Sequence, residues 1–250
     1  MVAGAFDVEE TAAQLARKHP ADVVRLALEL FSPDISISFS GAEDVVLIDM
    51  ASRAGLPFRV FSLDTGRLHP ETLAFIEKVR TRYDTPIDIY FPQPEAVQQL
   101  VRTKGLFSFY EDGHQECCGV RKVEPLRRAL APLRAYITGQ RKDQSPGTRA
   151  DIPIVQHDLA FSSDPDTPLV KFNPLANWTS AQVWQYIAEH EAPYNPLHDR
   201  GFKSIGCAPC TRPTNPGEHE RAGRWWWEEA TKKECGLHAI NLDAPENAPR

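Results

Sequence analysis

Apolar strands alternate with amphipathic helices through the first half of the chain. Segments rich in β-branched and aromatic residues recur at 35–39, 58–63, 87–91 and 135–139, and a helical pattern follows each of the first three. These strands are almost continuously apolar, which is typical of strands buried on both faces. Such strands separated by helices predict the α/β class, with a mostly parallel central sheet flanked by helices.

The two ends of the chain have other patterns. The first thirty residues predict two helices, the second of which opens at Pro20. In the second half, PIVQHD and LVKFNP are typical of short strands, and TSAQVWQYIAEH predicts a helix capped by Thr179 or Ser180. After about residue 195 the periodicity fades, and Pro, Gly, Cys and Arg dominate.

Composition argues against several classes of protein. The chain has 250 residues, of which 42% are hydrophobic and 25% charged, as in ordinary globular proteins. The formal net charge of −6 argues against general nucleic-acid binding, which favours a basic face. The apolar runs are shorter than a membrane span, and the start MVAGAFDVEE lacks the apolar region of a secretory signal. We therefore expect a cytoplasmic protein with reduced thiols and with no membrane or nucleic-acid partner.

Polar turns follow three of the predicted strands. Residues 38–44 (SFSGAED) and 63–67 (LDTGR) follow the first two, and a basic loop over 139–149 follows the fourth. Because ligands bind at the carboxyl ends of parallel strands, we expect these turns to lie at one edge of the sheet. Hydroxyls and free backbone N–H groups at a helix N-terminus suit a phosphate or sulfate. Each turn alone is equally typical of an ordinary surface turn.

Four of the five cysteines form two close pairs. Cys117 and Cys118 are adjacent, and Cys207 and Cys210 lie about ninety residues further on. Cys-x-x-Cys is typical ligand spacing for zinc or iron–sulfur, whereas an adjacent pair is less usual for zinc. The residues leave open one metal centre held by four thiolates, a thioredoxin-like dithiol, and four unrelated thiols.

The last thirty residues add three features. Arg221 and Arg224 are three residues apart, which in a helix would put both guanidinium groups on one face to bind a phosphate or sulfate. The three tryptophans at 225–227 cannot share one helical face, so we expect at least one of them to pack in the core. Cys235 stands alone between basic residues that favour its thiolate, although an isolated intracellular cysteine is commonly inert.

Together these motifs resemble those of the assimilatory adenylyl-sulfate (APS) reductases, which are relatives of the PAPS reductases. The matching stretches run in order over residues 38–238 and are SFSGAEDV, LDTGRL, ECCGVRKVEPL, GQRKDQSPGTR, IGCAPCTRP, RAGRWWWE and KECGLH. The resemblance implies an adenine-nucleotide α-hydrolase-like fold with a modified pyrophosphate-binding loop and a C-terminal tail that carries the catalytic cysteine. It implies a single reductase domain over 1–250, divided into N-terminal helices (1–31), a nucleotide-binding α/β core (32–203) and a cluster-binding and catalytic segment (204–250).

The resemblance also implies a reaction. The family reduces adenosine 5′-phosphosulfate (APS) to sulfite and AMP through a cysteine S-sulfonate, in sulfate assimilation and cysteine biosynthesis, with thioredoxin or glutaredoxin as reductant. Cys235 would be the nucleophile, and Cys117, Cys118, Cys207 and Cys210 would bind one 4Fe–4S cluster. The positions expected to bind or shape the substrate site, from the resemblance and from the 63–67 turn, are Ser38, Ser40, Leu63, Asp64, Arg67, Lys122, Gly139, Arg149, Arg221, Arg224 and His238.

Three alternatives stay open at this point. The first is PAPS reductase activity, which differs at the 3′ position of the nucleotide. The second is an ATP-dependent adenylyl transferase of the same fold, which would not need Cys235 and whose Ser-Gly-Gly loop is Ser-Gly-Ala here. The third is a zinc or iron–sulfur protein that senses redox state without catalysis. The sequence also leaves a homo-oligomer open.

Overall fold

A six-stranded sheet lies at the centre of the fold. The computed structural model describes residues 6–145, 149–164 and 166–228. Within these ranges the strand order is β3-β2-β1-β4-β6-β5, and only β5 and β6 pair antiparallel. The strands are β1 (Ile35–Phe39), β2 (Val60–Leu63), β3 (Ile87–Tyr90), β4 (Ala135–Ile137), β5 (Val155–His157) and β6 (Val170–Phe172). The predicted α/β class and mostly parallel sheet are therefore confirmed.

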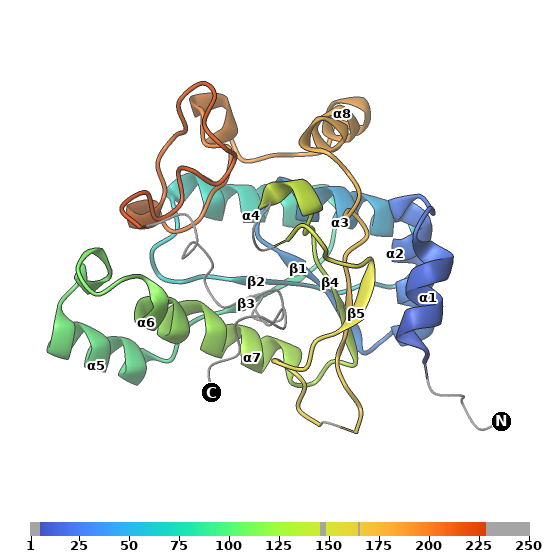
Figure 1. The fold of residues 1–250 in the computed structure, drawn as a ribbon, viewed down its shortest axis with the longest axis horizontal. Coiled ribbons are helices and arrows are strands. Elements are labelled where there is room, and N and C mark those ends of the chain that lie inside the picture. The colour runs from blue at the N-terminus through green and yellow to red at the C-terminus, as the bar shows by residue number, and fades with distance from the viewer. Residues whose placement is uncertain (1–5, 146–148, 165, 229–250) are drawn as a thin grey trace.

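Helices cover both faces of this sheet (Figure 1). One face carries α2 (Pro20–Phe31), α3 (Ala42–Ala54) and α4 (Pro70–Arg82). The other carries α5 (Pro94–Lys104), α6 (Gln115–Cys118) and α7 (Glu124–Leu130). At the edge, α1 (Val8–Leu15) contacts β5, and α8 (Ser180–His190) packs on α3. In the described part of the chain, every helix is too short or too polar to cross a lipid bilayer.

The strands divide their side chains between two apolar cores. Val60 and Ile137 belong to the core shared with α2, α3 and α4, whereas Phe61 and Tyr136 pack with Leu126 of α7. All five side chains are buried. Consecutive residues of one strand thus enter opposite cores, which is why the strands are apolar throughout rather than alternating.

Local signals set the helix boundaries. Proline begins α2, α4 and α5, where its missing N–H has no intrahelical partner to lose. Gly55 ends α3 with a φ of +68°, which a residue without a Cβ adopts without strain. The Thr179 hydroxyl accepts the backbone N–H of Gln182 and caps α8, which confirms that alternative of the predicted cap.

The adjacent cysteines lie on an irregular helix that the sequence pattern did not reveal. The short helix α6 ends at Cys118, and residues 119–123 form a π-helical turn that leads into α7. An extra residue in a π-turn shifts the side chains that follow it around the axis, and such turns are frequent at functional sites.

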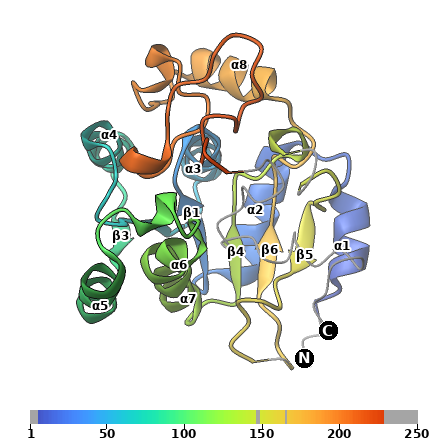
Figure 2. The same cartoon turned by 60° about the vertical axis from the view of Figure 1, so that its left-hand side comes forward.

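The strand order reverses between β1 and β4. The chain continues from β1 to β2 and β3 on one side, and β4 then pairs with the other side of β1. The loops that follow β1 and β4 therefore meet at the carboxyl edge of the sheet, where open α/β sheets bind ligands. The segment after α8, drawn in orange to red, lies beside this edge (Figure 2).

Candidate active site

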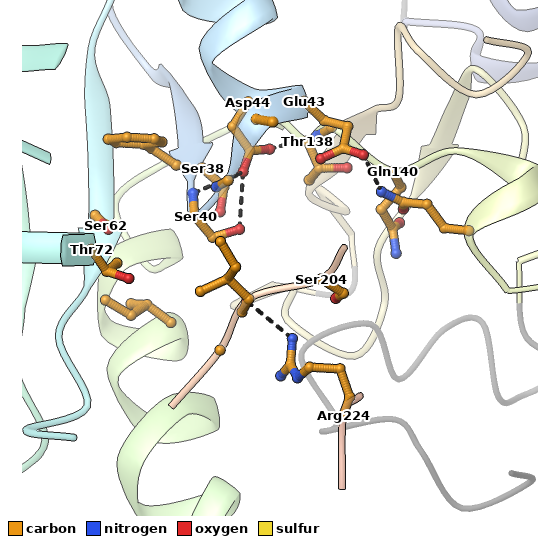
Figure 3. Close-up of a pocket in the computed structure, with 18 of the residues that line it drawn as sticks. Ser38, Ser40, Glu43, Asp44, Ser62, Thr72, Thr138, Gln140, Ser204 and Arg224 are labelled. Carbon is orange, nitrogen blue, oxygen red and sulfur yellow. Dashed lines mark hydrogen bonds between the residues drawn. The ribbon is translucent and has the colours of Figure 1, made fainter. Parts of the chain in front are cut away.

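A cleft of about 200 Å³ opens at the carboxyl ends of β1, β2 and β4. Its walls come from the loop after β1, the start of α3, the loop after β4 and the C-terminal segment, which is the described part of the chain after α8 (191–228) (Figure 3). The structure brings most of the predicted substrate positions to this cleft. Its lining includes Ser38, Ser40, Leu63, Lys122, Gly139, Arg149, Arg221 and Arg224.

The buried carboxylate of Asp44 ties two of these loops together. One oxygen accepts the backbone N–H groups of Ser40 at 2.8 Å and Gly41 at 2.9 Å, and also the Ser40 hydroxyl at 2.9 Å. The other oxygen accepts the N–H of Gly139 at 2.9 Å, from the loop after β4. Burial raises the pKa of Asp44 to about 6, although the donors from Ser40 oppose the shift. Asp44 therefore fixes the spacing between the loops after β1 and β4.

This arrangement bears on one expectation for the turn after β1. The sequence suggested that the turn over 38–44 offers free backbone N–H groups at a helix N-terminus to an anion, and the N–H groups in question here are those of Ser40 and Gly41. Both N–H groups donate to Asp44 instead. The cleft lining also carries four cations that can donate to a phosphate or sulfate, namely Lys122, Arg149, Arg221 and Arg224.

Arg141 forms ion pairs that connect the C-terminal segment to the sheet edge. Its side chain is 1% exposed and donates to Glu43 at the start of α3 and to Glu220, each at 2.8 Å. Burial raises the pKa of Glu220 to about 7, Glu43 adds to the shift, and Arg141 opposes it. Because Glu220 precedes Arg221, this ion pair helps to hold Arg221 beside the cleft.

The two arginines of the C-terminal segment occupy a turn and not the helix face considered from the sequence. The N–H of Arg224 donates to the carbonyl oxygen of Arg221 at 3.0 Å. The Arg224 guanidinium carbon lies 4.6 Å from the ring centroid of Trp225, which is fully buried. Trp226 is 40% exposed. At least one tryptophan therefore anchors the core, as predicted.

The four described cysteines gather in one buried cluster. Cys118, Cys207 and Cys210 are buried and Cys117 is half-buried, and all four are thiols rather than disulfides. They line a small cavity together with Arg67, Phe109, His114, Arg121 and Lys122. Two segments about ninety residues apart in the chain therefore meet, as a shared centre would require.

Cationic groups and a hydroxyl surround these sulfur atoms. The Thr65 hydroxyl lies 3.2 Å from Cys207 Sγ, and Arg121 donates to the Thr65 carbonyl oxygen at 2.7 Å. Burial acts to raise the pKa of Cys207, but Lys122, the Thr65 hydroxyl, Arg224 and Arg121 together outweigh it, so the pKa is lowered. Burial and the neighbouring Cys207 raise the pKa of Cys210 to about 12.

The cleft and the cysteine cavity have a common wall. Lys122 and Cys207 line both of them. The Lys122 ammonium lies 5.6 Å from the centroid of the Trp225 ring, which also contacts Arg224. A cation at this wall can interact with an anion in the cleft and with thiolates behind it.

Known proteins share this sequence over most of its length. Residues 34–213 match the family described as the phosphoadenosine phosphosulfate reductase domain. The adenosine 5′-phosphosulfate reductase of Pseudomonas aeruginosa (strain LESB58) is 60% identical over 95% of this chain and 88% of that protein. The chain belongs to the APS/PAPS reductase family.

Plant and fungal members of this reductase family extend the comparison. A probable chloroplastic 5′-adenylylsulfate reductase of rice is 58% identical over 96% of this chain, which spans 51% of that longer protein. The crystal structure of a PAPS reductase from Candida auris superposes with a TM-score of 0.66 and 30% identity, over 81% of this chain and 94% of that one. An FMN adenylyltransferase of Candida glabrata has a TM-score of 0.54 at 19% identity, over 89% of this chain and 76% of that one, and shows a common fold alone.

Two of the predicted substrate residues lie away from the reductase cleft. The Asp64 carboxylate accepts the N–H of Gly66 at 2.8 Å, and Asp64 is absent from the cleft lining. Arg67 lines the cysteine cavity, over the rings of Phe107 and Phe109. The predicted nucleophile Cys235 and the predicted substrate contact His238 lie outside the described residues.

Sequence reasoning missed several residues that shape the site. Asp44, Gln140, Arg141 and Glu220 all lie in stretches that were singled out or directly beside them. The contacts of Asp44, Arg141 and Glu220 span long stretches of the chain, 95 positions from Asp44 to Gly139 and 79 from Arg141 to Glu220. A local motif carries no signal for such pairs.

The cysteine cavity fits an anionic group bound by thiolates. Arg67 Nη1 and Arg121 Nε are buried and have no hydrogen-bond partner within the described residues, and both side chains line the cavity. No three of the described His, Cys, Asp or Glu residues are arranged to hold a metal ion. The gathering of the four thiols, and not a formed metal site, is therefore the observation that bears on a cofactor.

Proposed function

We propose that this chain reduces APS to sulfite and AMP, as a step of sulfate assimilation that leads to cysteine biosynthesis. The observation that carries the proposal is the common wall of Lys122 and Cys207 between the cleft and the cysteine cavity. The names of the bacterial and plant relatives support the same substrate and reaction.

The cleft suits an adenine nucleotide. The cleft has apolar lining at the end of β2, in the loop after it, on α4 and on α7, which suits a stacked base: Leu63, Leu68, Ile76 and Leu126. Arg149, Arg221, Arg224 and Lys122 add positive charge along the rest of the lining. The phosphosulfate group would therefore lie against these cations, with the base on the apolar side.

Cys235 is proposed as the nucleophile. Its thiolate attacks the sulfur of APS, a sulfur–sulfur bond forms, and the bond from sulfur to the phosphate oxygen breaks. AMP leaves with the electron pair of that bond, and Cys235 retains an S-sulfonate. Lys122, Arg221 and Arg224 would stabilise the negative charge that grows on the departing phosphate oxygen.

A thioredoxin-type dithiol is proposed as the reductant. One of its thiolates attacks the sulfur atom of Cys235, so that sulfite leaves with the electron pair of the sulfur–sulfur bond and a mixed disulfide forms. The second thiol of the dithiol then releases Cys235 as a thiolate. The dithiol thus supplies both electrons, and sulfur(VI) becomes sulfur(IV).

The four clustered cysteines are proposed to bind one 4Fe–4S cluster. Cys117, Cys118, Cys207 and Cys210 would be the ligands, and a bound cluster supplies an anionic centre that holds the two chain segments together. The thiols already account for the electrons of the reaction. Lys122 would neutralise part of the negative charge on both sides of the common wall.

Iron analysis tests this cofactor. Anaerobically purified protein should be brown and contain four irons per chain. Replacing Cys210 by Ser should lower the iron content, whereas replacing Cys235 by Ser should leave it unchanged. Stoichiometric zinc in a colourless wild-type protein would refute the proposed cluster.

Sulfite release tests the function itself. Wild-type protein with thioredoxin should release sulfite and AMP from APS faster than from PAPS, and the Cys235→Ser variant should release none. A preference for PAPS would replace the proposed substrate. Magnesium-dependent release of pyrophosphate from ATP, without sulfite, would favour an adenylyl transferase of the same fold instead.

The division of the chain and its location belong to the same proposal. Residues 1–250 would form a single reductase domain, with N-terminal helices over 1–31, a nucleotide-binding core over 32–203 and a cluster-binding and catalytic segment over 204–250. A reducing compartment such as the cytoplasm suits the proposed thiol chemistry, because Cys235 must stay reduced before each turnover.

A further inference from the structure

A buried amide without partners lies on the wall of the cleft. Gln140 follows Gly139 in the loop after β4 and is 3% exposed. Neither its Oε1 nor its Nε2 atom has a hydrogen-bond partner within the described residues. Gln140 lines the cleft, and Figure 3 places it near Glu43 at the edge of the cavity.

The neighbouring Gln144 has hydrogen-bond partners for its amide, so a lack of partners is not a general property of this loop. Gln144 Oε1 accepts from the backbone N–H of Arg141 at 3.1 Å and from Arg149 Nη1 at 2.6 Å. Its Nε2 donates to Glu43 at 3.0 Å. Most buried polar groups have such partners, and a buried group without one destabilises the fold. Gln140 therefore holds an unused donor and an unused acceptor, both buried, at the wall of the cleft.

The strand order locates Gln140 within the cleft. The apolar residue Leu63 ends β2, whereas Gln140 follows β4, and β1 separates these strands. In Figure 3, Ser62 and Thr72 lie on the opposite side of the view from Gln140. A nucleotide with its base against the apolar side would thus turn a polar part toward Gln140.

We propose that the side-chain amide of Gln140 binds the ribose hydroxyls of the nucleotide. A hydroxyl both donates and accepts, so the 2′- and 3′-hydroxyls together can satisfy Nε2 and Oε1. This inference rests on the proposed function, because it takes an adenine nucleotide as the occupant of the cleft. It makes Gln140 a specificity-determining residue at the sugar.

Nucleotide binding by the full-length protein, loaded with its cofactor, tests the proposal. Calorimetry should compare AMP, 2′-deoxy-AMP, 3′-deoxy-AMP and IMP on wild type and on Gln140→Met, an apolar side chain of similar length. Gln140→Met should bind AMP about tenfold more weakly, which corresponds to the loss of a hydrogen bond. At least one deoxy nucleotide should bind wild type about tenfold more weakly than AMP does. That nucleotide should bind Gln140→Met with nearly the same affinity as it binds wild type, because the contact is already missing.

Gln156→Met provides a matched control. Gln156 lies on β5, its Nε2 is also buried without a partner in the described part of the chain, and it is absent from the cleft lining. This variant should bind AMP as wild type does. The thermal midpoint and iron content of both variants show whether any loss comes from misfolding.

The possible failures are distinct. Wild type that binds no AMP would overturn both the nucleotide site of the proposed function and this inference. Wild type that binds AMP and both deoxy nucleotides equally would overturn the inference alone, without any variant. A third outcome would also overturn the inference: Gln140→Met changes the ratio of AMP to IMP affinity, while both deoxy nucleotides still bind the variant more weakly than AMP by the same factor as they bind wild type. The amide would then contact the base, as glutamine does with adenine elsewhere.

Discussion

Asp44 and Gly139 organise the cleft at the scale of single residues. The carboxylate of Asp44 accepts the Gly139 N–H at 2.9 Å, which brings the two backbones close together. A Cβ added at Gly139 would lie 2.5 Å from Glu43 Cβ and 3.0 Å from the backbone nitrogen of Asp44. Glycine is thus required here by close approach rather than by an unusual backbone angle.

Replacing Gly139 by Ala should separate the two loops. We expect a loss of about 1–3 kcal/mol in the free energy of unfolding, because the added methyl overpacks a rigid contact. AMP affinity should fall as well, since the lining residues on the two loops would shift apart. Thermal unfolding and calorimetry measure the two effects.

Gly41→Ala is the matched control for that substitution. Gly41 has an extended φ of −158°, and the nearest atom to an added Cβ is a Glu43 carboxylate oxygen at 3.9 Å. This variant should unfold nearly as wild type does, and it controls for stability alone, because Gly41 lines the cleft. Equal effects of the two alanines would contradict the assigned role of Gly139.

Residue-scale prediction from sequence located residues of the cleft lining where the signal is local. Ser38, Ser40 and Gly139 were found through motifs that read directly along the chain, and all three line the cleft. Asp44 lay inside the SFSGAED motif, yet its contact to Gly139 spans 95 positions. Gln140 has no local signal either, because its importance comes from partners that it lacks in the described structure.

At the scale of elements, ion pairs help to place the C-terminal segment. Arg141 pairs with Glu220 of this segment and with Glu43 of α3, each at 2.8 Å. Desolvation raises the pKa of Glu220 from 4.5 to about 7. The folded state therefore holds this proton more tightly than the unfolded chain does.

Protonated Glu220 contributes to the free energy of unfolding. This contribution is fully present below about pH 4.5 and is lost as the pH rises through about 7. The side chain of Glu220→Gln cannot ionise. The free energy of unfolding of this variant relative to wild type should therefore increase between pH 4.5 and pH 7, by up to about 3 kcal/mol, because the pKa of Glu220 is raised from 4.5 to about 7. Thermal midpoints of both proteins at pH 5 and pH 8 give the comparison.

Glu218→Gln tests the sign of that effect on the same segment. Arg212 holds the pKa of Glu218 at about 2, below its ordinary value. That pairing contributes stability at neutral pH and loses it as the pH falls, so wild type should gain relative to Glu218→Gln as the pH rises. The same pH trend in both variants would be inconsistent with the assigned environments.

Element-scale prediction from sequence was strong for the sheet and weak for the segments beside the cysteines. β1 was predicted with its observed bounds, and α8 with one of the two proposed caps. The π-helical turn at 119–123 was missed. Two residues of this turn, Arg121 and Lys122, line the cysteine cavity, and helix propensity does not encode such a turn.

At the scale of the whole molecule, the five cysteines have two different roles in this account. Four join the segments around 117–118 and 207–210 into one buried cluster, and Lys122 connects that cluster to the cleft. The fifth, Cys235, is proposed to react. The four clustered cysteines therefore have a structural role, whereas the proposed role of Cys235 is chemical.

Serine substitutions should separate these two roles. Cys210→Ser should lose iron, lower the thermal midpoint and weaken AMP binding, because a bound cluster stabilises only the folded arrangement. Cys235→Ser should keep iron, midpoint and AMP affinity, and lose sulfite release alone. A Cys210→Ser protein that kept full AMP affinity would show that the cleft does not depend on the cysteine cluster.

The most direct test of the account is the mass of the protein after incubation with APS in the absence of any reductant. We predict one added SO₃ group per chain, located on Cys235 by peptide analysis, and one equivalent of AMP released. An adduct on another cysteine, or sulfite release at the wild-type rate by Cys235→Ser, would contradict the central claim that this thiol captures the sulfonate group.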